Sequence, residues 1–125
     1  MNASSSAAAA YREAHIHNAP PLKLVQMLYE GALRFLDQAE TALGAADGAR
    51  FQERCLRAVA IVAELRLALD PAQAPELAAN LEALYLFAEE AIRNAMRTDA
   101  SAPLEPARDV LRTLLDGWKR LELAT

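Results

Sequence analysis

NAPPLKLVQMLYEGALRFL, residues 18–36, joins a helix-start signal to a helical pattern with more apolar positions than one helix face can hold. Asn18 can cap a helix, and Pro20 and Pro21 suit a first turn, where a missing N–H costs nothing. Apolar residues then recur at spacings of three and four, which predicts one core-facing side of a helix. These residues are Leu22, Val25, Tyr29, Ala32, Leu36, Ala39 and Leu43.

A second apolar line, formed by Leu24, Leu28, Gly31 and Phe35, lies beside the first on the same predicted helix. A surface helix of a small bundle needs only one apolar side. Two explanations are open at this point. A bundle rich in alanine can bury more than one side of each helix, or the second line can form a groove for an amphipathic helix of a partner.

Similar patterns predict four helices, from about 21 to 43, 49 to 69, 75 to 97 and 104 to 123. The predicted core of the second helix is Phe51, Cys55, Val59, Val62, Leu65 and Leu69. The third contributes Leu77, Leu81, Leu84, Ala88, Ile92 and Ala95, and the fourth Leu104, Ala107, Leu111, Leu114, Trp118 and Leu121. Asp70-Pro71 stops the second helix, because a residue before proline avoids the helical region.

Short connections make consecutive helices antiparallel neighbours. We therefore expect an all-α fold, an antiparallel up-down-up-down four-helix bundle with an N-terminal arm. The expected boundaries are a flexible arm over residues 1–20 and a bundle over 21–125. The arm carries two apolar anchors, Tyr11 and Ile16, which could cover the groove when the partner is absent.

Charge and composition exclude several classes of function. The net charge is −4, from 13 basic and 17 acidic side chains, and no basic block stands out. Nucleic-acid binding and attraction to an anionic membrane are therefore not expected. Residues 1–10 lack the basic start and long apolar run of a secretory signal, and no apolar run is long enough for a membrane span. We expect a cytoplasmic protein.

The sequence offers little material for catalysis. Di-iron bundles need Glu-x-x-His motifs inside the bundle, but His15 and His17 precede the first helix, and Glu89 and Glu90 have no histidine nearby. Cys55, the single cysteine, sits at a core position without a His or Asp partner at a readable spacing. We expect no enzyme activity, no cofactor and no metal. Arg66, Asp70 and Asp99 are expected to be solvated caps or helix-dipole partners near helix ends.

Off-core apolar residues remain as the candidate binding site. They lie on the first helix at Leu24, Leu28 and Phe35, on the second at Leu56 and Leu67, and on the third at Leu86, with Tyr11 and Ile16 from the arm.

Three stretches resemble the FliS-type flagellar secretion chaperone family, and the resemblance spans about residues 11–118. PLKLVQMLYEGAL, residues 21–33, is similar to the family's signature of proline, two variable residues, Leu-Val/Ile, Met-Leu-Tyr, an acidic residue and Gly-Ala. Residues 65–70 and ELAANLEALY, residues 76–85, are similar to its linker and following helix, and Trp118 matches its tryptophan. This chain departs from the family at Asn18, where Thr or Ser is usual, and in its loops.

The resemblance implies a chaperone that binds the disordered C-terminal segment of flagellin in the cytoplasm, prevents its polymerisation and delivers it to the flagellar type III secretion apparatus. It also implies the export gate and the late-gene anti-sigma factor as further partners. A disordered client that folds on binding wraps a large surface at modest affinity per area. The alternative is a helical regulatory or adaptor module that binds another amphipathic helix.

Overall fold

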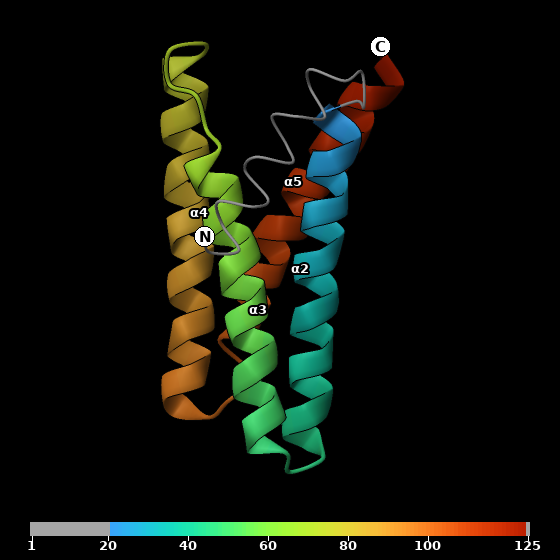
Figure 1. Ribbon diagram of the computed structural model, residues 1–125, viewed down its shortest axis with the longest axis vertical. Coiled ribbons are helices and arrows are strands. Elements are labelled where there is room, and N and C mark those ends of the chain that lie inside the picture. The colour runs from blue at the N-terminus through green and yellow to red at the C-terminus, as the bar shows by residue number, and fades with distance from the viewer. Residues whose placement is uncertain (1–20, 125) are drawn as a thin grey trace, which may run out of the picture.

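The computed structural model describes residues 21–124, and its secondary structure there is entirely helical. The helices are α2 (Pro21–Gly44), α3 (Gly48–Leu67), α4 (Pro75–Thr98) and α5 (Leu104–Ala124). They run in alternating directions, and α2 packs against α5 as well as α3, which closes the bundle (Figure 1). The predicted four-helix bundle is confirmed. Asn18, Tyr11, Ile16 and the rest of the arm lie outside the described residues, and the boundary at 20/21 stays a prediction.

Local signals explain where helices begin and end. The Asp47 carboxylate accepts from the Arg50 backbone N–H at 3.1 Å and caps the start of α3. Asp99 follows α4 in the left-handed conformation, with φ 49°, a conformation that Asp tolerates better than most residues. Asp70 accepts from the Ala72 backbone N–H at 3.0 Å in the turn between α3 and α4. Asp70 and Asp99 are both exposed, as expected for residues near helix ends.

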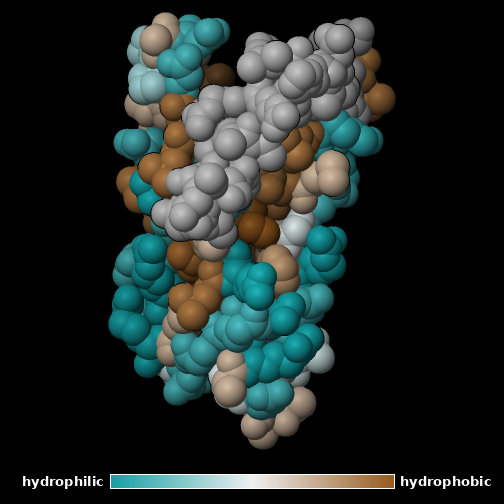
Figure 2. All heavy atoms as spheres, viewed as in Figure 1, coloured by the Kyte–Doolittle hydropathy of each residue, from teal (hydrophilic) through white to brown (hydrophobic). Residues whose placement is uncertain are grey.

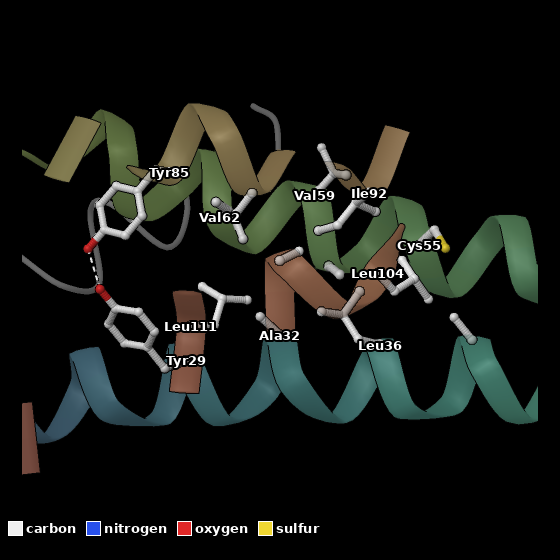
Figure 3. Packing of buried hydrophobic residues seen from close by; sticks show 14 of the residues in the cluster. Tyr29, Ala32, Leu36, Cys55, Val59, Val62, Tyr85, Ile92, Leu104 and Leu111 are labelled. Atoms are coloured by element: carbon white, nitrogen blue, oxygen red, sulfur yellow. Dashed lines mark hydrogen bonds between the residues drawn. The ribbon is translucent and has the colours of Figure 1, made fainter. Parts of the chain in front are cut away.

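The core is a single cluster of buried residues from all four helices (Figure 3). Most of the predicted core positions of α2 and α3 are buried. Leu43, Leu69, Leu114 and Trp118 are partly buried and pack against the cluster. Cys55 is fully buried, as expected.

The predicted core side of α4 is wrong at two positions. Leu77 is 53% exposed and Leu84 is 38% exposed, whereas Ala78 and Tyr85 are buried. The buried residues of α4 follow regular helical spacing when read as Ala78, Leu81, Tyr85, Ala88, Ile92 and Ala95. The predicted set and the observed set both fit a helical period. The prediction chose Leu77 and Leu84 because they are large and apolar, but the buried residues are their neighbours Ala78 and Tyr85.

A smaller correction concerns the end of α5. Leu121 is 50% exposed, although its spacing predicted a core position, and Leu115 is buried instead. The buried side of α5 therefore does not continue through Leu121.

Tyr29 and Tyr85 point toward each other inside the bundle, and their hydroxyl groups share a hydrogen bond (Figure 3). The Trp118 indole Nε1 donates to the Tyr29 hydroxyl at 3.1 Å. This network joins α2, α4 and α5 through polar atoms of the side chains. Its geometry sets the spacing of these helices, because each buried hydroxyl needs its partner.

Arg108 ties α5 to α2 near the opposite end of the contact between these helices. Its side chain is almost fully buried, with Nη2 3.0 Å from Glu40 and Nε 3.3 Å from Asp37, both on α2, and Nη1 2.6 Å from Glu105 on its own helix. Burial opposes the charged guanidinium, but Glu40, Glu105 and Asp37 outweigh it and raise the pKa of Arg108. The charge is therefore retained inside the bundle.

Candidate partner-binding surface

The α2 candidates Leu24, Leu28 and Phe35 are partly buried. Leu28 and Phe35 also pack against the core cluster. The Arg54 guanidinium lies 5.4 Å from the centre of the Phe35 ring, a cation–π contact that covers one face of the ring. Of these three side chains, Phe35 is thus already engaged within the bundle.

α2 and α3 are in contact at the level of Gly31. A Cβ atom at Gly31 would lie 3.4 Å from the Ile61 Cδ1 of α3, which is an ordinary van der Waals contact. The predicted second apolar line of α2 is therefore partly a helix–helix contact. This is the first of the two explanations that the sequence left open.

The candidates on α3 and α4 are more accessible. Leu56 is 57% exposed, Leu67 is 59% exposed and Leu86 is 47% exposed. Leu56 and Leu67 are separated by three helical turns, which corresponds to about 16 Å along the helix axis. The smaller Ala60 and Ala63 occupy the same side of α3 between them and are only partly buried.

In Figure 2, which shows the face that includes α3, brown hydrophobic residues gather over the middle of the face. Teal hydrophilic residues dominate its lower part. Isolated exposed leucines are common on soluble proteins, but a contiguous apolar area indicates an interaction site. We define the α3–α4 surface as Leu56, Ala60, Ala63, Leu67 and Leu86.

A pocket of about 350 Å³ lies where α3 ends and α4 begins. Its wall includes Leu67 of the α3–α4 surface and residues from both helices and the turn between them, namely Arg66, Leu67, Leu69, Pro71, Pro75, Ala78, Ala79 and Glu82. The pocket is therefore continuous with one end of the exposed apolar line on α3.

Arg66, which lines this pocket, is held by the carboxylate of Glu89 on α4. Its Nε lies 2.7 Å from Glu89 Oε2 and its Nη2 lies 3.2 Å from Glu89 Oε1, and the Glu89 side chain is 1% exposed. The hydrogen bonds to Glu89 raise the pKa of Arg66. Arg66 lies in the last turn of α3, where a helix-dipole partner was expected, but its side chain is only partly exposed and is paired with Glu89. Sequence spacing could not reveal this carboxylate, because it lies on another helix.

Several exposed apolar residues were missing from the sequence-based candidates. They are Met27 at 59%, Leu77 at 53%, Leu84 at 38% and Phe87 at 51% exposure. Met27 stands outside both apolar lines predicted for its helix. If Tyr85 rather than Leu84 had been assigned to the core of α4, the sequence would have predicted that Leu77 and Leu84 are exposed.

The described residues show no chemistry typical of a catalytic centre. Within residues 21–124, no group of three or more His, Cys, Asp or Glu side chains could hold a metal ion. Burial raises the pKa of the Cys55 thiol to about 11, so it stays protonated at neutral pH and is a poor nucleophile. None of the described helices is long and apolar enough to cross a membrane.

A helical bundle with an exposed apolar surface fits many binding proteins, and comparison with known families decides among them. The family model for the flagellar protein FliS matches residues 3–124, nearly the whole chain. The chain belongs to the FliS family. The resemblance seen in the sequence motifs is thereby confirmed, and FliS proteins are chaperones rather than enzymes.

Curated relatives agree with the family match over most of their length. The chain is 31% identical over 109 residues to the flagellar secretion chaperone FliSB of Pseudomonas aeruginosa, covering 85% of this chain and 84% of that protein. It is 30% identical over 111 residues to the flagellar secretion chaperone FliS of Salmonella typhimurium, covering 87% and 82%. It is 31% identical over 101 residues to the Campylobacter jejuni protein of the same name, covering 81% and 79%.

Proposed function

We propose that this FliS-family chain is a cytoplasmic export chaperone that binds the disordered C-terminal segment of flagellin. In this role it prevents premature polymerisation and delivers flagellin to the flagellar type III secretion apparatus. The observation that carries the proposal is the family match over residues 3–124. The export gate and the late-gene anti-sigma factor are further proposed partners, on the strength of the family resemblance alone.

The α3–α4 surface supplies a physical basis for client binding. Leu56, Leu67 and Leu86 present apolar side chains that an amphipathic helix can cover through residues at i, i+3, i+4 and i+7. A disordered segment loses conformational entropy when it folds on its partner, so it needs a long apolar track. The partly buried Leu24, Leu28 and Phe35 belong to the proposed track as its less accessible part.

Tyr11 and Ile16 are proposed to cover part of this track when no client is bound. Both are apolar anchors in an otherwise small-residue and polar arm, and an exposed apolar surface on the free chaperone favours self-association. Tyr11→Ala should change the affinity for flagellin while shifting the melting temperature by only a few degrees, as for a change worth under about 1 kcal/mol.

Charge substitution on the α3–α4 surface tests the proposed function directly. Leu56→Asp and Leu67→Asp should each abolish binding of a flagellin C-terminal peptide in a calorimetric titration, while circular dichroism shows a helical, cooperatively melting protein. Leu121→Asp on α5 is the matched control, because Leu121 is similarly exposed but lies outside the surface. Failure of the unmodified protein to bind the peptide would sink the proposal itself.

Leu24→Asp separates the two explanations for the second apolar line of α2. Leu24 is partly buried and does not belong to the core cluster. If the variant stays folded and loses the client, Leu24 belongs to the track. If it unfolds, the residue is a packing position, and only the more exposed part of the surface remains assigned.

A further inference from the structure

The pocket between the end of α3 and the start of α4 has a composition that points to one kind of occupant. Leu67, Leu69, Pro71 and Pro75 supply apolar walls, with Ala78 and Ala79 of α4 on the side of that helix. Its volume of about 350 Å³ is near the lower end for ligand pockets. A pocket of this size and lining suits one large apolar side chain rather than a whole helix.

Arg66 adds a hydrogen-bond donor whose position is fixed. Its Nε and Nη2 face Glu89, and within residues 21–124 its Nη1 makes no hydrogen bond. A guanidinium carries five N–H donors in a rigid plane, so the contact with Glu89 leaves donors available in a defined direction. An occupant that places an oxygen acceptor beside its apolar group would satisfy them.

The charges of the pocket lining indicate which kind of oxygen acceptor an occupant would place beside Arg66. Arg66 and Glu82 both line the pocket, so their opposite charges balance. A carboxylate occupant would meet Glu82 as well as Arg66, whereas a neutral carbonyl oxygen would not be repelled. A main-chain carbonyl next to a bulky apolar residue therefore fits this lining better than an acidic side chain.

Leu67 connects the pocket to the surface assigned to the client. It is 59% exposed and belongs to both, so a helix lying along α3 from Leu56 would reach the pocket at its end. Figure 1 shows the α3–α4 turn at one end of the molecule, so a client helix along α3 would end there. The last turn of a helix also offers free carbonyl groups.

From these observations we propose that the pocket is an anchoring subsite for flagellin. It takes one bulky apolar side chain of the client segment, while Arg66 donates to a main-chain carbonyl beside that side chain. The inference rests on the proposed function and adds to it a specific position at which the client is held.

Filling the pocket tests the assignment without disturbing the core. Ala79 is exposed and lines the pocket, so Ala79→Trp should place an indole in the space meant for the client. Ala83→Trp is the matched control, one turn further along α4, exposed and outside the pocket lining. Ala79→Trp should weaken binding of the flagellin C-terminal peptide by about tenfold or more, as for loss of a buried anchor. Ala83→Trp should bind within about twofold of the unmodified chain.

A thermodynamic cycle identifies the anchor residue. Each bulky apolar residue of the peptide is replaced by Ala and titrated against the unmodified chain and against Ala79→Trp. One replacement should weaken binding to the unmodified chain and have little further effect on Ala79→Trp, because the two changes remove the same contact.

The outcomes separate this inference from the proposed function. If the unmodified chain binds the peptide and Ala79→Trp binds equally well, the pocket assignment fails while the chaperone proposal stands. If the loss caused by Ala79→Trp disappears when residues 1–20 are removed, the arm is the occupant and the assignment to flagellin is wrong. A change in sedimentation of the free protein with unchanged peptide affinity assigns the pocket to self-association and equally overturns the inference.

Discussion

Arg66 on α3 donates two hydrogen bonds to Glu89 on α4, from Nε to Oε2 at 2.7 Å and from Nη2 to Oε1 at 3.2 Å. Glu89 is fully buried, so the pair crosses the interface between the helices that carry the proposed client surface. Arg93 adds a longer contact of 3.6 Å to the same carboxylate. The relative position of α3 and α4 therefore depends on an ion pair as well as on apolar packing.

We predict that Glu89→Ala destabilises the fold by about 1.5–3 kcal/mol, because it removes the charge-assisted hydrogen bonds to Arg66, whose side chain is 25% exposed and can be hydrated once the carboxylate is gone. Glu90→Ala is the control. Glu90 also pairs with an arginine, Arg97 at 2.8 Å, but both side chains are exposed. Its loss should cost about 0–1 kcal/mol. Urea unfolding monitored by circular dichroism measures both values, and similar costs would show that Glu89 is not the critical partner.

The corrected core line of α4 leads to a second prediction. Tyr85→Ala should cost about 3–5 kcal/mol, the range for truncating a buried aromatic residue, and it also removes the hydroxyl that bonds Tyr29. Leu84→Ala, the neighbouring position on the exposed side, should cost much less. Thermal unfolding of the two variants decides the matter, and a larger loss for Leu84→Ala would restore the line predicted from sequence.

Cys55 should be unreactive in the folded protein. Its side chain is fully buried, and burial raises the pKa of its thiol to about 11. Labelling by a thiol reagent at neutral pH should therefore follow unfolding, and its rate should rise with urea in parallel with the unfolded fraction. Rapid labelling without denaturant, at the rate of a model thiol, would contradict the buried placement.

Glu64 provides a test that depends on pH. Its side chain is buried on α3, and loss of hydration raises the pKa of its carboxyl group. The charged form is then less favourable in the folded chain than in the unfolded chain. This cost is present above the folded pKa and disappears below the unfolded value of about 4.3.

Glu64→Gln should therefore raise the melting temperature at about pH 7 and have little effect at about pH 4. Glu30→Gln, at an exposed position on α2, controls for the change in net charge. A stabilisation by Glu64→Gln that grows as the pH falls would have the wrong sign for a buried carboxylate.

Much of the architecture could be predicted from local signals in the sequence. Pro21, Gly44, Asp47 and Pro75 mark helix ends through backbone chemistry that acts over a few residues. The apolar spacing in α2 and α3 identified most of their buried positions, because a helix packed on one side must place its apolar residues about every 3.6 positions. The family motifs are also short stretches of neighbouring residues, on α2, at the end of α3 and on α4, so the family could be recognised as well.

The limits of sequence reasoning appear where two helical readings compete. Leu84 and Tyr85 are adjacent large residues, and either could continue a core line through Leu81 and Ala88. Only the rotation of α4 against its neighbours chooses Tyr85, whose hydroxyl meets Tyr29 from α2. Phe35 shows the same limit, since its cover by Arg54 of α3 is a contact between helices.

By itself the sequence determined the helices, their order and the family, because periodicity, caps and motifs are properties of neighbouring residues. Tertiary structure alone decided which apolar residues stay accessible, that Arg66 is pinned by Glu89, and that a pocket opens beside Leu67. These features depend on the rotation and separation of packed helices. They involve residues that are far apart in the chain. The pattern of apolar residues within one helix does not show which residues of another helix it will contact.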